Sequence, residues 1–103
     1  MLKITDNEID NLLKSNKNVL IKYSAAWCNP CKTLSPILES VQKDNSDILI
    51  IEADVTENEK STKKYNIKNV PTCILVSNGE EVARFMGTKT SDKVSEFIKE
   101  HIN

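Results

Sequence analysis

Hydrophobic and polar positions follow two spacings along this chain, one helical and one strand-like. Apolar residues at intervals of three and four follow Thr5 and Glu8, which have the spacing of a capping box, and together they predict a first helix. Short runs of consecutive apolar residues predict strands that are buried on both faces. The expected elements are an edge strand at 2–4, a helix at 6–15, a strand at 19–23, a helix from Pro30, a strand at 48–51, a helix at 56–65, strands at 73–76 and 82–86, and a helix opened by Thr90.

The connections between these elements predict the fold class. Asn78 and Gly79 lie between the last two strands, and both residue types tolerate a positive φ, so they predict a tight hairpin and an antiparallel pair. Crossover helices between the earlier strands make those strands parallel. We therefore expect an α/β fold in which helices cover both faces of a mixed sheet, as a three-layer sandwich.

Length and composition exclude several functional classes. The 103 residues, 39% of them hydrophobic, contain no repeat or linker, which predicts a single domain over residues 1–103. A formal net charge of -1 leaves no basic surface for nucleic acid or an anionic membrane. No apolar run reaches the roughly 18 to 20 residues of a membrane helix. The start is charged from Lys3 onward and lacks a secretory signal, which favours the cytoplasm, where three cysteines are not expected to form structural disulfides.

The candidate chemistry lies in the sequence Trp27-Cys28-Asn29-Pro30-Cys31-Lys32, at the junction of a predicted strand and a predicted helix. Cys28 is expected at the helix N-terminus, where unpaired amides and the helix dipole favour a thiolate. Pro30 suits the first turn, where its missing amide hydrogen is not needed. Cys31 would lie one turn further in and be more buried. This asymmetry predicts Cys28 as the attacking nucleophile and Cys31 as the resolving thiol of a redox pair.

A metal site is the main alternative for such a pair. Zinc would need two more ligands, and the remaining candidates are Cys73 and His101. Cys73 lies in an apolar strand and is expected to be a small core residue. His101 lies at the end of the last helix and is expected to pack there. The sequence therefore disfavours a metal.

The chain resembles the thioredoxin family from end to end. Its motif is similar to the family's Trp-Cys-Gly-Pro-Cys-Lys, with Asn29 where glycine is usual. Val70-Pro71-Thr72 resembles the family's cis-proline loop, and Gly87 resembles the glycine that follows the last strand. Pro36 resembles the proline that kinks the active-site helix. The resemblance implies a thioredoxin fold, with a five-stranded mixed sheet flanked by four helices.

The resemblance also implies a function. A member of this family reduces disulfides in partner proteins by dithiol–disulfide exchange, here through Cys28 and Cys31, and needs no cofactor because the two sulfurs carry both electrons. It implies a separate thioredoxin reductase, a flavoprotein linked to nicotinamide or to ferredoxin, and a monomeric chain. Two alternatives stay open: a disulfide oxidant or isomerase of different redox poise, and a binding module within a larger complex.

In the family, an extended client segment pairs with the main chain beside the cis-proline, largely independently of its side chains. An apolar docking surface around the nucleophile is therefore implied. The client-binding residues that the resemblance implies are Trp27, Pro30, Val70, Pro71, Thr72 and Gly87.

Three positions depart from the family pattern and are expected, with Asn29, to change the surroundings of the cysteines. Lys22 stands where a buried aspartate is usual, and Glu52 stands where many bacterial members have a lysine. We expect the two to pair behind Cys31, where the cation would favour a Cys31 thiolate; the alternative is that Lys22 extends to solvent. Ser24 replaces a frequent aromatic residue and is expected to leave a smaller hydrophobic floor.

Overall fold

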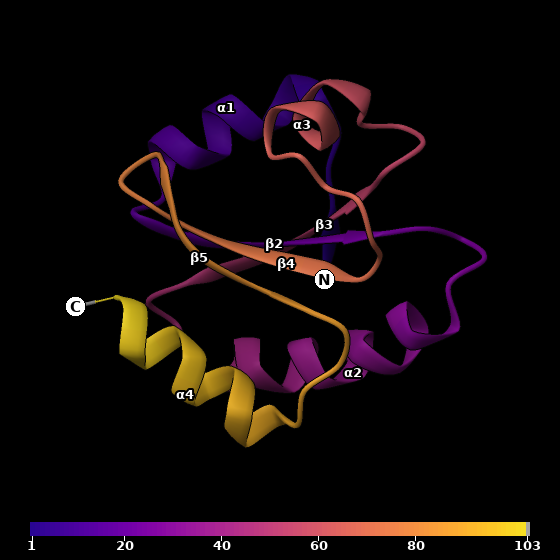
Figure 1. Cartoon of the computed structure of the whole chain (residues 1–103). Coiled ribbons are helices and arrows are strands. Elements are labelled where there is room, and N and C mark those ends of the chain that lie inside the picture. The colour runs from indigo at the N-terminus through magenta and orange to yellow at the C-terminus, as the bar shows by residue number, and fades with distance from the viewer. Residues whose placement is uncertain (103) are drawn as a thin grey trace.

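A computed structural model describes residues 1–102 and contains five strands and four helices within them (Figure 1). In chain order these are β1 (Leu2–Lys3), α1 (Asp6–Ser15), β2 (Asn18–Ser24), α2 (Asn29–Asp44), β3 (Leu49–Asp54), α3 (Glu59–Lys64), β4 (Thr72–Ser77), β5 (Glu80–Met86) and α4 (Ser91–His101).

The strands form one mixed sheet in the order β1-β3-β2-β4-β5. The pairs β1–β3 and β2–β3 are parallel, whereas β2–β4 and β4–β5 are antiparallel. Helices α1 and α3 lie on one face of the sheet and α2 and α4 lie on the other (Figure 1). The three-layer sandwich expected from the order of elements is thus confirmed.

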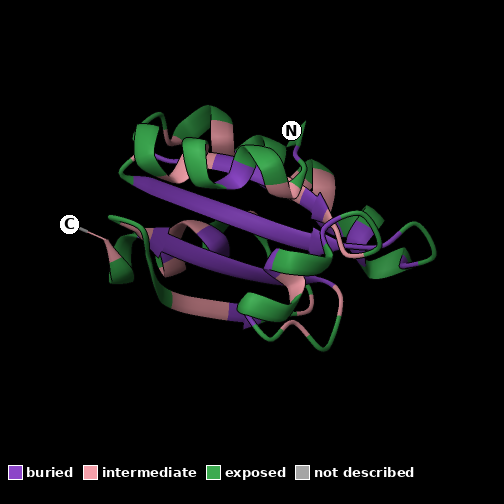
Figure 2. Ribbon diagram, turned by 90° about the horizontal axis from the view of Figure 1, so that it is seen from above, coloured by how far each residue is buried: buried purple, intermediate pink, exposed green. Residues whose placement is uncertain are grey.

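Two hydrophobic clusters separate the layers, and the central strands belong to both (Figure 2). Leu20 of β2 packs toward α2 and α4, and its neighbour Ile21 packs toward α1 and α3, because successive side chains of a strand point to opposite faces. Every residue of β2 is buried, including Lys22. A charge on this strand therefore needs partners within the protein.

Local hydrogen bonds explain why the third helix begins later than predicted. The third helix begins at Glu59 and not near Thr56, because the Asp54 carboxylate accepts hydrogen bonds from the amide and the hydroxyl of Thr56 at 2.8 and 2.6 Å and holds a turn there. At the hairpin, Asn78 and Gly79 have φ values of 52° and 82°, as the predicted turn requires.

The third cysteine lies deep in the core. Cys73 of β4 is fully buried in the cluster beneath α2 and α4. Burial raises the pKa of its thiol from 9.0 to about 12, although the charge of Lys22 acts in the opposite direction. The native thiol therefore stays protonated at pH values where an unfolded cysteine ionises.

We expect Cys73 to resist alkylation by iodoacetamide in the reduced native protein at about pH 8 and to react once urea unfolds the chain, because the thiolate is the reactive form. Peptide mass spectrometry locates the label. Because the native state holds this proton between pH 9.0 and about 12 and the unfolded state releases it, stability should fall as pH rises through that window. Equal labelling in native and unfolded protein would contradict the assignment.

Candidate active site

Cys28 and Cys31 form a disulfide at the N-terminus of α2, immediately after the loop that leaves β2. Cys28 is the N-cap residue, and its sulfur accepts a hydrogen bond from the Cys31 amide at 3.2 Å. Pro30 lies in the first turn. The two side chains are nearly buried, with exposed fractions of 6% for Cys28 and 2% for Cys31. The predicted helix-terminal position of the pair is confirmed.

Two further chain segments meet the disulfide. Val70 packs against the buried cluster that contains Cys28 and Cys31, and the peptide bond between Val70 and Pro71 is cis. The Gly87 amide donates to the Pro71 carbonyl at 2.9 Å, which holds the end of β5 against this loop. The segments that the sequence singled out therefore come together from β2, β4 and β5.

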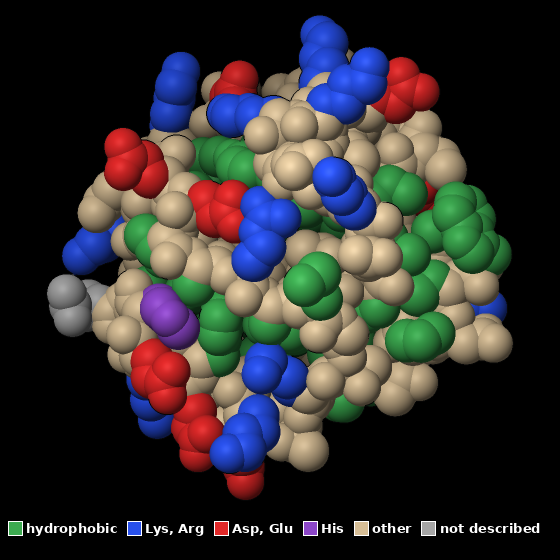
Figure 3. Space-filling model, in the orientation of Figure 1, with side chains coloured by type: hydrophobic (Ala, Val, Ile, Leu, Met, Phe, Trp, Pro, Cys, Tyr) green, Lys and Arg blue, Asp and Glu red, His purple; other side chains and the backbone are tan. Residues whose placement is uncertain are grey.

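The surface beside the disulfide is apolar. Trp27 is 69% exposed, and Met86 at the end of β5 is 63% exposed. Hydrophobic side chains gather at this end of the molecule (Figure 3). A cavity of about 500 Å³ lies between the tryptophan and α3, and its lining residues are Trp27, Val55, Thr62, Ile67, Lys68, Asn69 and Val70. Pro71 and Thr72 are both buried behind this surface, and the Thr72 hydroxyl donates to the Asn69 carbonyl at 2.6 Å.

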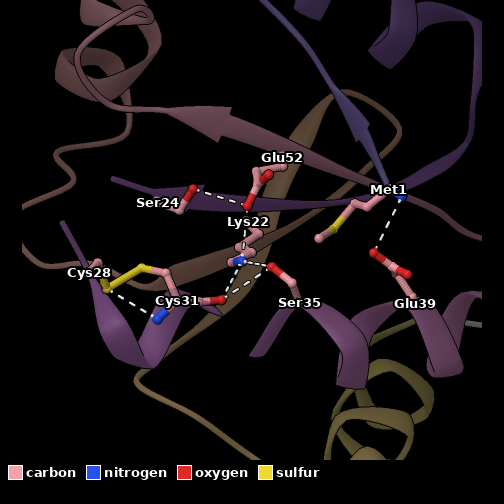
Figure 4. A network of polar contacts seen from close by, with 8 residues as sticks. All are labelled: Met1, Lys22, Ser24, Cys28, Cys31, Ser35, Glu39 and Glu52. Atoms are coloured by element: carbon pink, nitrogen blue, oxygen red, sulfur yellow. Dashed lines mark hydrogen bonds and ion pairs between the residues drawn. A yellow bond between two sulfur atoms is a disulfide. The ribbon is translucent and has the colours of Figure 1, made fainter. Parts of the chain in front are cut away.

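A buried polar network lies behind the disulfide (Figure 4). The side chain of Lys22 is 1% exposed, and its Nζ donates to Glu52 Oε2 at 2.9 Å. The expected ion pair is thus confirmed, and the alternative in which Lys22 extends to solvent is wrong. Nζ also donates to the main-chain oxygen of Cys31 at 2.7 Å and to Ser35 Oγ at 2.5 Å.

Two serines in this network were not anticipated as partners of the ion pair. Ser24 is buried and donates to Glu52 Oε2 at 3.1 Å, so this position also supplies a polar contact that the sequence did not predict. Ser35 donates to the Cys31 carbonyl at 3.2 Å. Its signal in the sequence was its place one helical turn after Cys31. A cavity of about 310 Å³ borders Cys31, Lys22 and Glu52.

Residues 1–102 contain no group of three or more His, Cys, Asp or Glu side chains that could hold a metal ion. His101 is exposed, and its Nδ1 lies 2.8 Å from the Phe97 carbonyl oxygen. None of the helices within residues 1–102 is both long and apolar enough to cross a membrane.

Comparisons with known proteins agree with this geometry. Residues 1–100 match the family model for thioredoxin. The chain is 35% identical to a thioredoxin of Chlamydia caviae over 101 residues, which are 98% of this chain and 99% of the relative. It is 34% identical to a thioredoxin of Buchnera aphidicola over 105 residues, which cover 100% of this chain and 97% of the relative.

Solved structures give the same result. A thioredoxin variant from Halobacterium salinarum superposes with a TM-score of 0.91 at 29% identity, covering 99% of this chain and 90% of that one. A thioredoxin from Fasciola hepatica has a TM-score of 0.90 at 30% identity, covering 99% of this chain and 100% of that one. Proteins of this kind exchange disulfides with client proteins and depend on a reductase. The chain belongs to the thioredoxin family and is a thiol–disulfide oxidoreductase whose redox centre is the Cys28–Cys31 disulfide.

Proposed function

We propose that the chain reduces client disulfides through a Cys-Asn-Pro-Cys site in which Cys28 is the nucleophile and Cys31 the resolving thiol. The Cys28 thiolate attacks a client disulfide, forms a mixed disulfide and releases one client thiolate. Cys31, as a thiolate, then attacks the Cys28 sulfur, which releases the second client thiolate and closes the Cys28–Cys31 disulfide. Two electrons pass to the client. The observation that supports these roles best is the position of Cys28 as N-cap of α2, where the helix terminus stabilises a thiolate.

Client proteins would dock on the apolar surface around Cys28. The main chain of Val70 would pair with an extended client segment, and Trp27 and Pro30 would contact it from the other side. Pro71 and Gly87 would hold the Val70 segment in place, which is supported by the 2.9 Å hydrogen bond between them. Thr72 would help to hold the same loop, because its hydroxyl donates a hydrogen bond to the Asn69 carbonyl.

The proposal also covers the state in which the chain works and the enzyme that regenerates its dithiol. The chain, residues 1–103, would work as a single domain and a monomer in the cytoplasm, although residue 103 lies outside the described residues. A flavoprotein reductase linked to nicotinamide or to ferredoxin would return the dithiol. No cofactor is needed on this chain because the cysteine pair carries both electrons. Asn29, Lys22 and Glu52 would adjust the reactivity of that pair.

Catalysed insulin reduction tests the central proposal. We expect the protein to accelerate the reduction of insulin by dithiothreitol, measured as turbidity, and the Cys28→Ser variant to lose that acceleration. A Cys31→Ser variant should instead accumulate a mixed disulfide with a client, because the resolving step is missing. Trapping by Cys28→Ser and not by Cys31→Ser would reverse the two roles.

A second experiment tests the docking surface. Replacing Trp27 by alanine should lower kcat/KM for a protein client about tenfold, because a large exposed aromatic at the centre of a contact commonly contributes more than about 1 kcal/mol. Val82→Ala is the matched control, since Val82 is also an exposed apolar residue, at 45%, but lies on β5 outside the surface described. Equal losses in both variants would remove Trp27 from the docking surface.

A further inference from the structure

The ammonium of Lys22 is a fixed charge behind the disulfide. Among residues 1–102, Lys22 is the one charged residue that is fully buried. A lysine ammonium has three N–H donors, and here all three have acceptors: the Cys31 carbonyl, Ser35 Oγ and Glu52 Oε2. Because every donor has an acceptor inside the protein, these contacts hold the ammonium in place. It stays next to the backbone of the resolving cysteine.

The counter-charge lies further out. The Glu52 side chain is 13% exposed, whereas that of Lys22 is 1% exposed. Both side chains border the cavity of about 310 Å³, but Glu52 is the more exposed of the two, so solvent screens its charge more strongly. The other charged side chains that line this cavity are Lys3, Lys32, Asp54 and Glu57.

These outer charges have little effect at the cysteines. Lys3 lies across from Glu52 on β1, and Lys3, Lys32 and Glu57 are exposed, so solvent weakens their fields. Asp54 is half-buried and lies two residues beyond Glu52, at the end of β3. Cys73 lies across from Lys22 on β4 and is a neutral thiol. The charge in direct contact with Cys31 is therefore the buried cation, which contributes a positive potential there.

A positive potential favours one redox state over the other. The disulfide is neutral, whereas the reduced site has two cysteine sulfurs that can bear negative charge. In exchange with glutathione, the Cys28–Cys31 disulfide and two glutathione thiols give two cysteine thiols and one glutathione disulfide. A cation behind Cys31 stabilises the thiolate form of the product and leaves the energy of the neutral disulfide almost unchanged.

We propose that Lys22 is a positioning residue that shifts this equilibrium toward the reduced site, and that Glu52 opposes it. The inference rests on the proposed function and specifies which clients that function serves. A site displaced toward the dithiol is a weaker reductant. It would reduce strained or exposed client disulfides, which are the labile ones, more readily than buried structural disulfides.

Glutathione equilibration of three variants tests the inference, with the emission of Trp27 beside Cys28 as the signal. Lys22→Met should lower the equilibrium constant for dithiol formation about tenfold, which is about 30 mV for a two-electron couple. Glu52→Gln should raise the constant, because it removes the negative charge that partly offsets the charge of Lys22. Lys3→Met is the matched control: it removes an exposed lysine from the other side of Glu52, and the constant should change less than about twofold.

An electrostatic effect changes the equilibrium constant in opposite directions in Lys22→Met and Glu52→Gln. Structural damage would change the constant in the same direction in both variants. Circular dichroism and thermal unfolding of both redox forms check that each variant folds. The proposal is overturned if Lys22→Met shifts the constant no more than Lys3→Met, or if Glu52→Gln shifts it in the same direction. Should Lys22→Met not fold, Glu52→Gln decides alone, since an unchanged or lowered constant contradicts the proposal. The proposed function fails separately, when the unaltered protein does not accelerate insulin reduction.

Discussion

The burial of β2 on both faces is the constraint on which the site depends. A strand covered by helices above and below gives its side chains little access to water, so a charged side chain there needs partners within the protein. Lys22 meets this requirement with an acceptor on β3 and two on α2. The same contacts tie the first turn of the active-site helix to the centre of the sheet. The segment that carries the cysteines is therefore held by polar contacts as well as by hydrophobic packing.

Much of the fold could be predicted because its signals are local. The apolar runs, the capping residues and the Asn78-Gly79 turn each act within a few residues. The site motif was equally visible, and the pairing of Lys22 with Glu52 followed from the cost of burying a lysine alone. The late start of α3 was missed because it depends on a turn held by the Asp54 side chain, a contact that no periodicity records.

The partners of the ion pair were harder to anticipate for a three-dimensional reason. Ser35 faces Lys22 because of the rotation of α2 about its own axis over the sheet, and the sequence gives only its spacing from Cys31. Ser24 turns toward Glu52 because β2 and β3 run in parallel with Lys22 directly across from Glu52. Such contacts depend on how elements pack, and the pattern along one element does not contain that information.

The burial of Cys73 limits the number of thiols that can react with other molecules. In a protein with three accessible thiols, one thiol has no partner when the other two form a disulfide. That thiol could form a disulfide with a second copy of the chain or with another molecule. Here the third thiol is enclosed by β4 and the helices beneath it. The thiols that can reach a client are therefore those of the redox pair, and Cys73 is not available to a second molecule while the fold is intact.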